Sequence, residues 1–365
     1  MASSTTTSPA PEAVAPRPYL ADLYTFDWTK LCLHNSTVST VAPAVCLIGG
    51  VLIGHPSAGL IAGGGAVTIG FGINQRIADS RLAPMLAATL WMFVATFIGM
   101  WGGHHGATLL VTSAIFAFAY GILTAQASGV AWVGQQAAIA LFVSSAFPAG
   151  PRAAFERASL TLLGGAIQIV IITLWDRLLP ELRAQLKLDR HEMVAYLRTL
   201  PKALPELPRS ASFVYAVRLT LTVLIASEAY RRWGVQSGYW IPMTALLVQK
   251  PAFFETLTRA LLRVAGTLTG AVLCSHLLVY IHPNPIWLAI LATGFAFLGY
   301  ATVSVNYGLY SLFLTSYIVF LLSLNSLPAA VVAHRRAVCT LAGGLIALAL
   351  HLDGLRRHRA QQSAT

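Results

Sequence analysis

Long apolar segments follow one another along almost the whole chain, and they constrain its fold more than any other feature. Twelve of them are separated by short links, with a longer polar stretch near the middle. Hydrophobic residues make up 56% of the 365 residues and charged residues only 10%, whereas a soluble domain is about one quarter charged. Such runs are typical of membrane-spanning helices. The sequence therefore predicts an all-α, multi-pass membrane protein.

The twelve predicted transmembrane helices divide into two halves of six. They cover residues 38–54, 58–73, 82–102, 107–124, 130–147 and 158–175, then 212–230, 238–250, 260–281, 285–304, 307–324 and 336–351. Spans 58–73 and 238–250 are the shortest, and both carry glycine or proline. Short, interrupted spans at matching places in two halves indicate the binding region of a transporter. Pro242 in the second of them favours irregular backbone there.

The two halves also repeat one another in sequence. Residues 157–167 and 336–346 share seven of eleven positions, at an offset of 336 − 157 = 179 residues. Because each half has an even number of spans, we expect parallel repeats related by an axis along the membrane normal. A general likeness among apolar, glycine-rich helices is the alternative. The matched residues to which we assign a structural role are Arg157, Arg336, Gly164, Gly165, Gly343 and Gly344.

Arg157 and Arg336 stand in equivalent places before the Gly-Gly pairs. We expect each to hold the end of its helix by pairing with a carboxylate or with exposed carbonyls. Glycine pairs with GxxxG spacing recur elsewhere, and we expect them to let helices pack closely within one subunit. These pairs are Gly50/Gly54, Gly59/Gly63, Gly99/Gly103 and Gly266/Gly270.

Charge distribution predicts the orientation of the chain. The formal net charge is +11, and most of the 24 Lys and Arg residues fall in segments that are cytoplasmic if the N-terminus is inside. Both termini are therefore predicted to be cytoplasmic, and lipid headgroups rather than nucleic acid account for the charge. The predicted domains are a disordered tail 1–30, a membrane repeat 31–175, a cytoplasmic linker 176–211, a second membrane repeat 212–352 and a basic tail 353–365.

No catalytic pattern is recognisable, so we predict that the chain is not an enzyme. It has no P-loop and no Ser-His-Asp or Cys-His arrangement in a plausible context. The four cysteines lack CxxC spacing and are expected to be small buried hydrophobic residues. We predict no metal site and no cofactor.

Basic and aromatic residues around 238–263 are the best candidates for contact with a transported anion. Lys250, Arg259 and Arg263 gather at one end of two spans, and the two arginines share a helix face at i, i+4. They form either an anion-attracting mouth or a topology signal. Tyr239 and Trp240 either belong to an aromatic belt or stack on an aromatic carboxylate.

Two further groups are candidates for proton coupling. A basic pair in the first half is a candidate for the edge that corresponds to the anion-attracting mouth of the second half. Glu228 lies in an apolar span, but Arg231 and Arg232 follow it, so an interfacial ion pair is the alternative. His276 stands alone in an apolar stretch, and a packing histidine is the alternative there. Arg76 and Arg81 occupy the corresponding place in the first half.

Residues 237–270 carry a resemblance to a known family. They read Ser-Gly-Tyr-Trp-Ile-Pro-Met-Thr-Ala-Leu-Leu-Val-Gln-Lys-Pro, then Arg-Ala-Leu-Leu-Arg-Val-Ala-Gly-Thr-Leu-Thr-Gly from Arg259. This run resembles the signature of the fusaric acid resistance protein-like family, which includes the aromatic acid exporters. The resemblance implies an inner-membrane exporter of small, aromatic organic acids, driven by the proton gradient. It also implies a periplasmic adaptor protein or a homo-oligomer as possible partners, beside the lipid bilayer and the anion substrate. A passive organic-anion channel and a non-transporting membrane scaffold are the alternatives.

Overall fold

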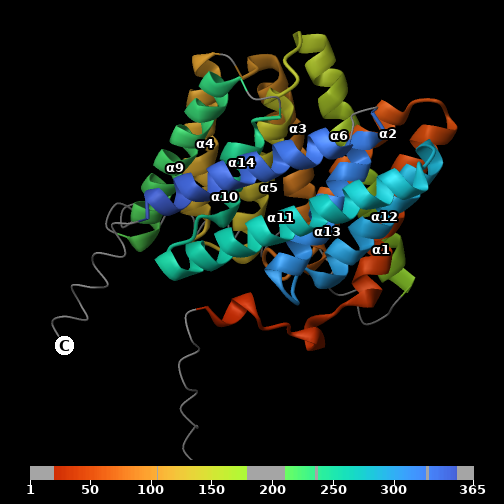
Figure 1. Ribbon diagram of the computed structural model, residues 1–365, viewed down its shortest axis with the longest axis horizontal. Coiled ribbons are helices and arrows are strands. Elements are labelled where there is room, and N and C mark those ends of the chain that lie inside the picture. Colours follow the sequence, from red (N-terminus) through yellow and green to blue (C-terminus); the bar gives the residue numbers. More distant parts are fainter. Residues whose placement is uncertain (1–19, 105, 179–209, 235–236, 326–328, 352–365) are drawn as a thin grey trace, which may run out of the picture.

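The computed structural model describes residues 20–104, 106–178, 210–234, 237–325 and 329–351, which form twelve α-helices (Figure 1). In the first half they are α1 (Leu33–Leu52), α2 (Pro56–Gly70), α3 (Leu82–Gly102), α4 (Ala107–Leu123), α5 (Ser128–Ser145) and α6 (Pro151–Leu178). In the second half they are α9 (Ala211–Trp233), α10 (Trp240–Val248), α11 (Phe253–Ile281), α12 (Pro285–Thr302), α13 (Tyr307–Ser323) and α14 (Ala329–Ala349). The 3-10 helix η3 (Phe71–Asn74) extends α2, and η1 (Ala21–Leu23) and η2 (Trp28–Lys30) precede α1.

The prediction of an all-helical membrane protein is confirmed. A helix is present at each of the twelve predicted spans, and eight of the described helices are long and apolar enough to cross a membrane. The helices α4 and α13 are apolar but only 17 residues long. The helix α10 has nine residues, so it rises about 13.5 Å and cannot cross a bilayer core of about 30 Å alone.

Several boundaries differ from the predicted ones because polar residues continue the helices beyond their apolar parts. The helix α11 begins at Phe253 rather than at 260, and α6 runs to Leu178 rather than to 175. Residues 20–30, predicted as part of a tail, include η1 and η2, and the Asn306 side chain donates to the carbonyl of Thr25 at 3.0 Å. Most of the predicted linker, 179–209, and the predicted tail 353–365 lie outside the described residues.

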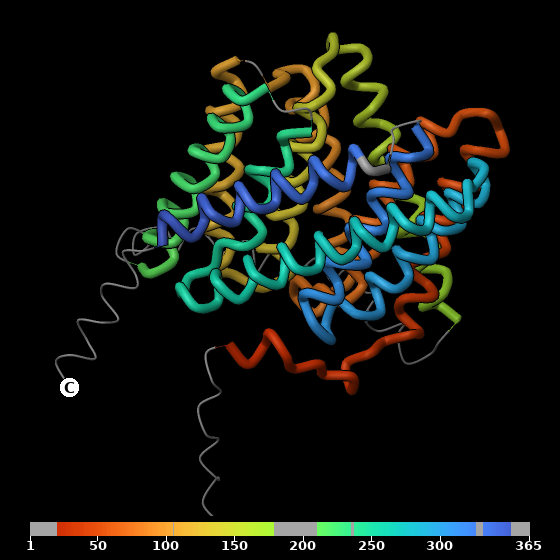
Figure 2. The backbone as a smooth tube through the Cα atoms, in the orientation of Figure 1, coloured from red at the N-terminus to blue at the C-terminus, as the bar shows by residue number. Residues whose placement is uncertain are grey.

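The helices of each half pack mainly on one another. In the first half α3 contacts α5 and α6, and α2 contacts α1 and α6. In the second half α11 contacts α13 and α14, and α10 contacts α9 and α14. The halves meet where α4 lies beside α9 at one end of the molecule and α1 lies beside α12 at the other (Figures 1 and 2). The short helix α10 lies between α14, α9 and α5, near the centre of the molecule.

Glycine residues allow the closest of these crossings. A Cβ atom on Gly164 would collide with the carbonyl of Ala62 in α2, and one on Gly343 would lie 2.5 Å from the carbonyl of Ile241 in α10. Likewise, a Cβ atom on Gly270 would lie 2.5 Å from the carbonyl of Leu312 in α13. The expected use of small residues for packing within the chain is therefore seen at these crossings.

Pro242 does not disturb α10, contrary to the expectation of irregular backbone. It is the third residue of the helix, where the N–H group would have no helical partner in any case. A residue other than proline at 242 could donate its N–H to the carbonyl of Gly238. That carbonyl instead accepts from the Ile241 N–H at 2.9 Å. The helix is short because Gln249 and Ala252 adopt extended backbone in the link to α11.

Candidate functional site

The two aromatic residues at the start of α10 lie inside the bundle. Tyr239 and Trp240 are each only 4% exposed, and their ring centroids are 4.8 Å apart. A belt residue would lie at the lipid-facing surface. These rings instead face other helices, which leaves contact with a substrate as the surviving prediction for them.

A buried arginine from α14 lies over the Trp240 ring. The guanidinium carbon of Arg336 is 3.9 Å from the ring centroid, and Nη2 of Arg336 donates to Oγ1 of Thr315 at 3.1 Å. The residue is 1% exposed, and its Nε and Nη1 groups have no protein partner. A desolvated cation–π contact is worth about 2 kcal/mol. Burying a cation without a counter-charge costs several kcal/mol, so these contacts alone do not offset it.

The partners expected for the two repeat arginines are wrong. Among the described residues, no carboxylate lies at ion-pair distance from Arg157 or Arg336. The guanidinium carbon of Arg157 lies 4.3 Å from the centroid of the Phe147 ring, while Glu156 pairs with Arg152 at 3.2 Å. Each repeat arginine is thus held against an aromatic ring, which stabilises a cation less than an ion pair would.

The two arginines of α11 have no carboxylate at ion-pair distance among the described residues, and one of them lies over an aromatic ring. The guanidinium carbon of Arg259 is 4.3 Å from the centroid of the Tyr307 ring. Arg263 is 1% exposed, and its Nε and Nη1 groups have no protein partner. The Ser311 hydroxyl donates to the backbone carbonyl of Arg263 at 3.3 Å, so this part of α11 is fixed against α13. Because Arg263 is buried inside the bundle, its side chain does not contact lipid headgroups, as that of a surface topology signal would.

Lys250 lies in the link between α10 and α11, outside the membrane-spanning helices. Its N–H donates to Oγ1 of Thr256 at 2.9 Å, and its carbonyl accepts from the His351 ring at 3.0 Å. Burial, reinforced by the positive charge of Arg259, lowers the pKa of Lys250 to about 8. The lysine is therefore poised to lose its charge slightly above neutral pH.

These basic residues are linked to one another, either directly or through a shared tyrosine. Tyr239 is within reach of the charges of Arg157 and Arg336, Arg336 is within reach of Arg263, and Lys250 is within reach of Arg259. Tyr310 is within reach of three of them, which joins the α11 pair to Arg336. We name these five cations the basic ladder. Its members, in spatial order, are Arg157, Arg336, Arg263, Arg259 and Lys250.

The two residues predicted for proton coupling are not part of the ladder. Glu228 accepts two hydrogen bonds from Arg231, each of 2.7 Å, and a further one from Arg232, so the ion-pair alternative is present. His276 is exposed on α11, and its Nδ1 lies 2.9 Å from the carbonyl of Val272 one turn earlier. The packing alternative for His276 therefore does not hold. A coupling role for either residue remains a prediction without structural support.

In the first half, Arg81 of the predicted basic pair Arg76 and Arg81 is neutralised. Nη1 of Arg81 lies 3.6 Å from Oδ2 of Asp176, and both side chains are buried. The sequence analysis missed Asp176 because it placed the end of the apolar span at 175, although the carboxylate lies within α6. Arg81 therefore holds the end of α6 against the start of α3, whereas Arg263 and Arg336 have no such partner.

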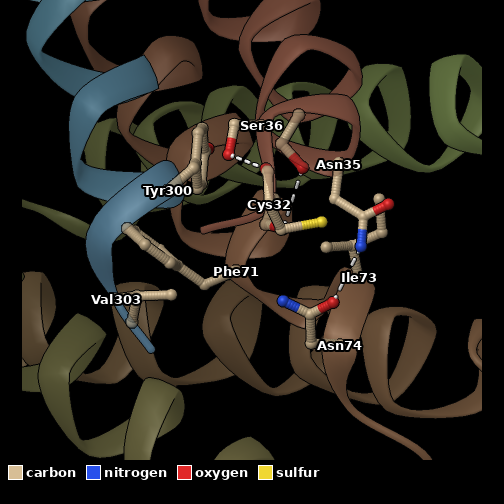
Figure 3. Close-up of a pocket in the computed structure, with 10 residues that line it drawn as sticks. Cys32, Asn35, Ser36, Phe71, Ile73, Asn74, Tyr300 and Val303 are labelled. Carbon is tan, nitrogen blue, oxygen red and sulfur yellow. Dashed lines mark hydrogen bonds between the residues drawn. The ribbon is translucent and has the colours of Figure 1, made fainter. Parts of the chain in front are cut away.

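Two cavities elsewhere in the described part of the chain do not suit an organic anion. Figure 3 shows the first, between α1, η3 and α12, where Nδ2 of Asn35 donates to Oδ1 of Asn74 at 3.0 Å. Its volume is about 10 Å³, room for a single water at most. The second is a depression of about 330 Å³ between α1 and α12 that has no charged residue in its lining. Neither could replace the hydration of a carboxylate.

Several polar residues near the ladder were not anticipated. Thr244 of α10, Thr267 of α11 and Thr315 of α13 are buried, and the hydroxyls of the first two have no partner. Threonine is common in transmembrane helices, where its hydroxyl usually bonds the carbonyl four residues earlier, so composition does not single these out. Their spacing could have indicated them, because residues four apart share a helix face. Thr267 is four residues after Arg263, and Thr244 is four after Trp240.

The second half of the chain matches a known family. Residues 221–350 match the sequence profile described as fusaric acid resistance protein-like, in agreement with the resemblance carried by residues 237–270. The profile covers α9 from Leu221 onward and all of α10 to α14, and therefore four of the five ladder residues.

Three curated relatives match part of the chain. The inner membrane protein YccS of Escherichia coli is 34% identical over 144 residues, which are 39% of this chain and 20% of YccS. Protein ORF2 of Neisseria gonorrhoeae is 32% identical over 143 residues, 38% of this chain and 33% of ORF2. The Synechocystis protein slr1298 is 30% identical over 146 residues, 39% of this chain and 19% of that protein. The chain spans about a fifth to a third of these relatives, and no solved structure matches it.

Proposed function

We propose that this chain, whose residues 221–350 belong to the fusaric acid resistance protein-like family, is a multi-pass inner-membrane transporter that exports small organic anions, aromatic carboxylates among them. Eight helices able to cross a membrane and the similarity to an inner membrane protein support the location. The observation that carries the proposal is the basic ladder. Among the described residues, none of its arginines has a carboxylate at ion-pair distance, so a transported anion could serve as their counter-charge.

The ladder provides a sequence of positive potentials rather than one strong site. Arg263 and Arg336 are 1% exposed, whereas Arg259 and Lys250 are half-buried. An anion that enters beside Lys250 would meet Arg259 and then the two buried arginines. Each step replaces hydration by guanidinium N–H donors, and the next cation offers another favourable position, so the anion need not remain at any one of them.

Two related six-helix units account for the arrangement around the ladder. The contacts of α2 with α6 and of α3 with α5 correspond to those of α10 with α14 and of α11 with α13. The contacts between the halves follow the same correspondence. Because α4 corresponds to α12 and α9 to α1, the pair α4–α9 corresponds to the pair α12–α1. The close approach of Gly164 to Ala62 recurs between Gly343 and Ile241, at an offset of 343 − 164 = 241 − 62 = 179. These equivalences support the two-repeat arrangement.

A passive anion channel is the second candidate, and one observation favours it. Among the described residues, no carboxylate lies at ion-pair distance from the ladder, and Glu228 is held by two arginines. A proton-coupled exporter needs a group that changes charge during the cycle. Within the ladder, Lys250 is the group best suited to that task, because its pKa is lowered to about 8.

Transport in proteoliposomes tests the proposal. The purified chain is reconstituted, and uptake of radiolabelled benzoate is measured against protein-free liposomes, with and without an imposed proton gradient. An exporter should accelerate benzoate movement and respond to the proton gradient at constant anion gradient. A channel should follow the anion electrochemical potential alone. Benzoate movement equal to that of protein-free liposomes under every gradient would overturn the transport function.

A further inference from the structure

Arg263 and Arg336 differ from the other arginines of the ladder in being almost wholly enclosed. Both are 1% exposed, and each has two guanidinium nitrogen atoms without a protein acceptor. Arg336 is fixed between the Trp240 ring and the Thr315 hydroxyl, and it lies within reach of the charge of Arg263. The two cations therefore repel one another in a region that no described carboxylate neutralises.

We infer that Arg263 and Arg336 together form an oxyanion-binding site, enclosed by α10, α11, α13 and α14, that takes a small carboxylate between the two guanidinium groups. The site deepens the transport function proposed above, and its ligand class rests on that function. The binding itself does not depend on transport, so the two can fail separately.

The donors around these two arginines select an anion. Besides the guanidinium groups, Nε1 of Trp240 and the hydroxyl of Thr267 are buried without a partner. Thr267 lies in a part of α11 that packs closely on Thr315, the residue that holds Arg336. A Cβ atom on Gly270, three residues after Thr267, would lie 3.2 Å from the Thr315 side chain. Unpartnered N–H donors beside two positive charges attract a carboxylate and repel a cation.

Two N–H groups of Arg336 are available for in-plane recognition of an anion. Stacking on Trp240 uses one face of the guanidinium group, whereas its N–H groups point outward in the plane of the fork. One of them is engaged by Thr315, and the Nε–H and Nη1–H groups are unpartnered. The Nε–H and Nη1–H groups lie on different edges of the fork, so each can donate one in-plane bond to a carboxylate oxygen, a directed arrangement that a lysine cannot provide.

A purely structural role predicts a different response to mutation. An arginine that only fills space can be replaced at a cost, because packing is lost. An uncompensated buried cation destabilises the ligand-free protein, so removing it should leave stability unchanged or raise it. Arg263 is the clearer case, since its side chain donates no hydrogen bond to any of the described residues.

Equilibrium thermal unfolding of the purified full-length chain in detergent tests the site, with benzoate and its neutral analogue benzamide as probes. Benzoate should raise the Tm of the wild type in a saturable manner, and benzamide should not. Arg263→Gln and Arg336→Gln should weaken the apparent benzoate affinity about tenfold or more. Arg336→Lys should retain an intermediate affinity, because the charge remains while the fork is lost.

The matched control is Arg152→Gln, because the Arg152 side chain is 94% exposed and pairs only with Glu156. It should bind benzoate as the wild type does. Phosphatidylglycerol added to the micelles tests whether a lipid phosphate occupies the site instead; in that case it would compete with benzoate. The ligand-free Tm of both Gln variants should equal or exceed that of the wild type.

Equal stabilisation by benzoate and benzamide, or unchanged benzoate affinity in both Gln variants, would overturn the site. A lower ligand-free Tm with unchanged affinity would assign the arginines to packing. If a Gln variant does not fold, the affinity of Arg263→Lys and Arg336→Lys decides the matter. Benzoate binding without transport in proteoliposomes would leave the site standing and remove the transport function alone.

Discussion

The charge state of Lys250 makes a quantitative prediction about transport. Burial and the neighbouring Arg259 lower the pKa of Lys250 to about 8, so the charged form is the one that the site disfavours. The lysine is then about 90% charged at pH 7 and about 10% charged at pH 9. If its charge draws the anion into the ladder, initial uptake should fall as pH rises through 8, approaching an eight- to tenfold loss by pH 9.

The assay is initial uptake of radiolabelled benzoate into proteoliposomes at pH values from 6 to 9, with equal pH on both sides and the membrane potential clamped. Benzoate is almost wholly ionised over this range, and the passive leak of its neutral acid, which falls as pH rises, is subtracted at each pH with protein-free liposomes. Lys250→Arg should flatten the profile, because arginine keeps its charge far above pH 9. Lys250→Gln should be slow at every pH. Coincident pH profiles for the wild type and Lys250→Arg would refute the role assigned to Lys250.

Three further outcomes are expected. Gly343→Leu should destabilise the folded protein by about 3 kcal/mol or more, measured by thermal unfolding in detergent, because its Cβ would press on the backbone of α10; an unchanged Tm would contradict the close crossing. Arg81→Met and Asp176→Asn should each cost about 3–5 kcal/mol, while combining Arg81→Met with Asp176→Leu should recover most of the loss, since the pair is buried; additive losses would show that the two charges do not interact. Cysteine labelling from outside intact cells at Ser210 and Ser363, in a cysteine-free background, should give no signal, and clear labelling at either position would rule out cytoplasmic placement of both.

The sequence predicted the helices well because hydropathy in a membrane protein reflects the solvent directly. The predicted span 82–102 has the bounds of α3, and the short spans 58–73 and 238–250 are indeed the places where α2 is followed by η3 and where α10 ends after nine residues. The pattern could not give the ends of α6 and α11. Their terminal turns carry charged residues such as Asp176 and Glu255, which hydropathy assigns to loops.

The sequence also located Lys250, Arg259 and Arg263, but not their relation to the repeat arginines. Arg336 is 73 residues from Arg263 along the chain, and only the packing of α14 against α10 and α11 brings the two together. No periodicity predicts such a meeting. Equally, the sequence could not tell that Arg81 has a buried acidic partner and Arg336 has an aromatic one, because both depend on tertiary contacts.

The central claim is that anions move along the basic ladder, and neutralising its members one at a time tests this most directly. Initial uptake of radiolabelled benzoate is measured in proteoliposomes, per amount of folded protein, for Lys250→Gln, Arg259→Gln and Arg263→Gln. Each rate should fall below that of the wild type, and Arg263→Lys should retain more activity than Arg263→Gln because attraction depends mainly on charge. If all three neutral variants transport benzoate at the wild-type rate, the ladder is not the path.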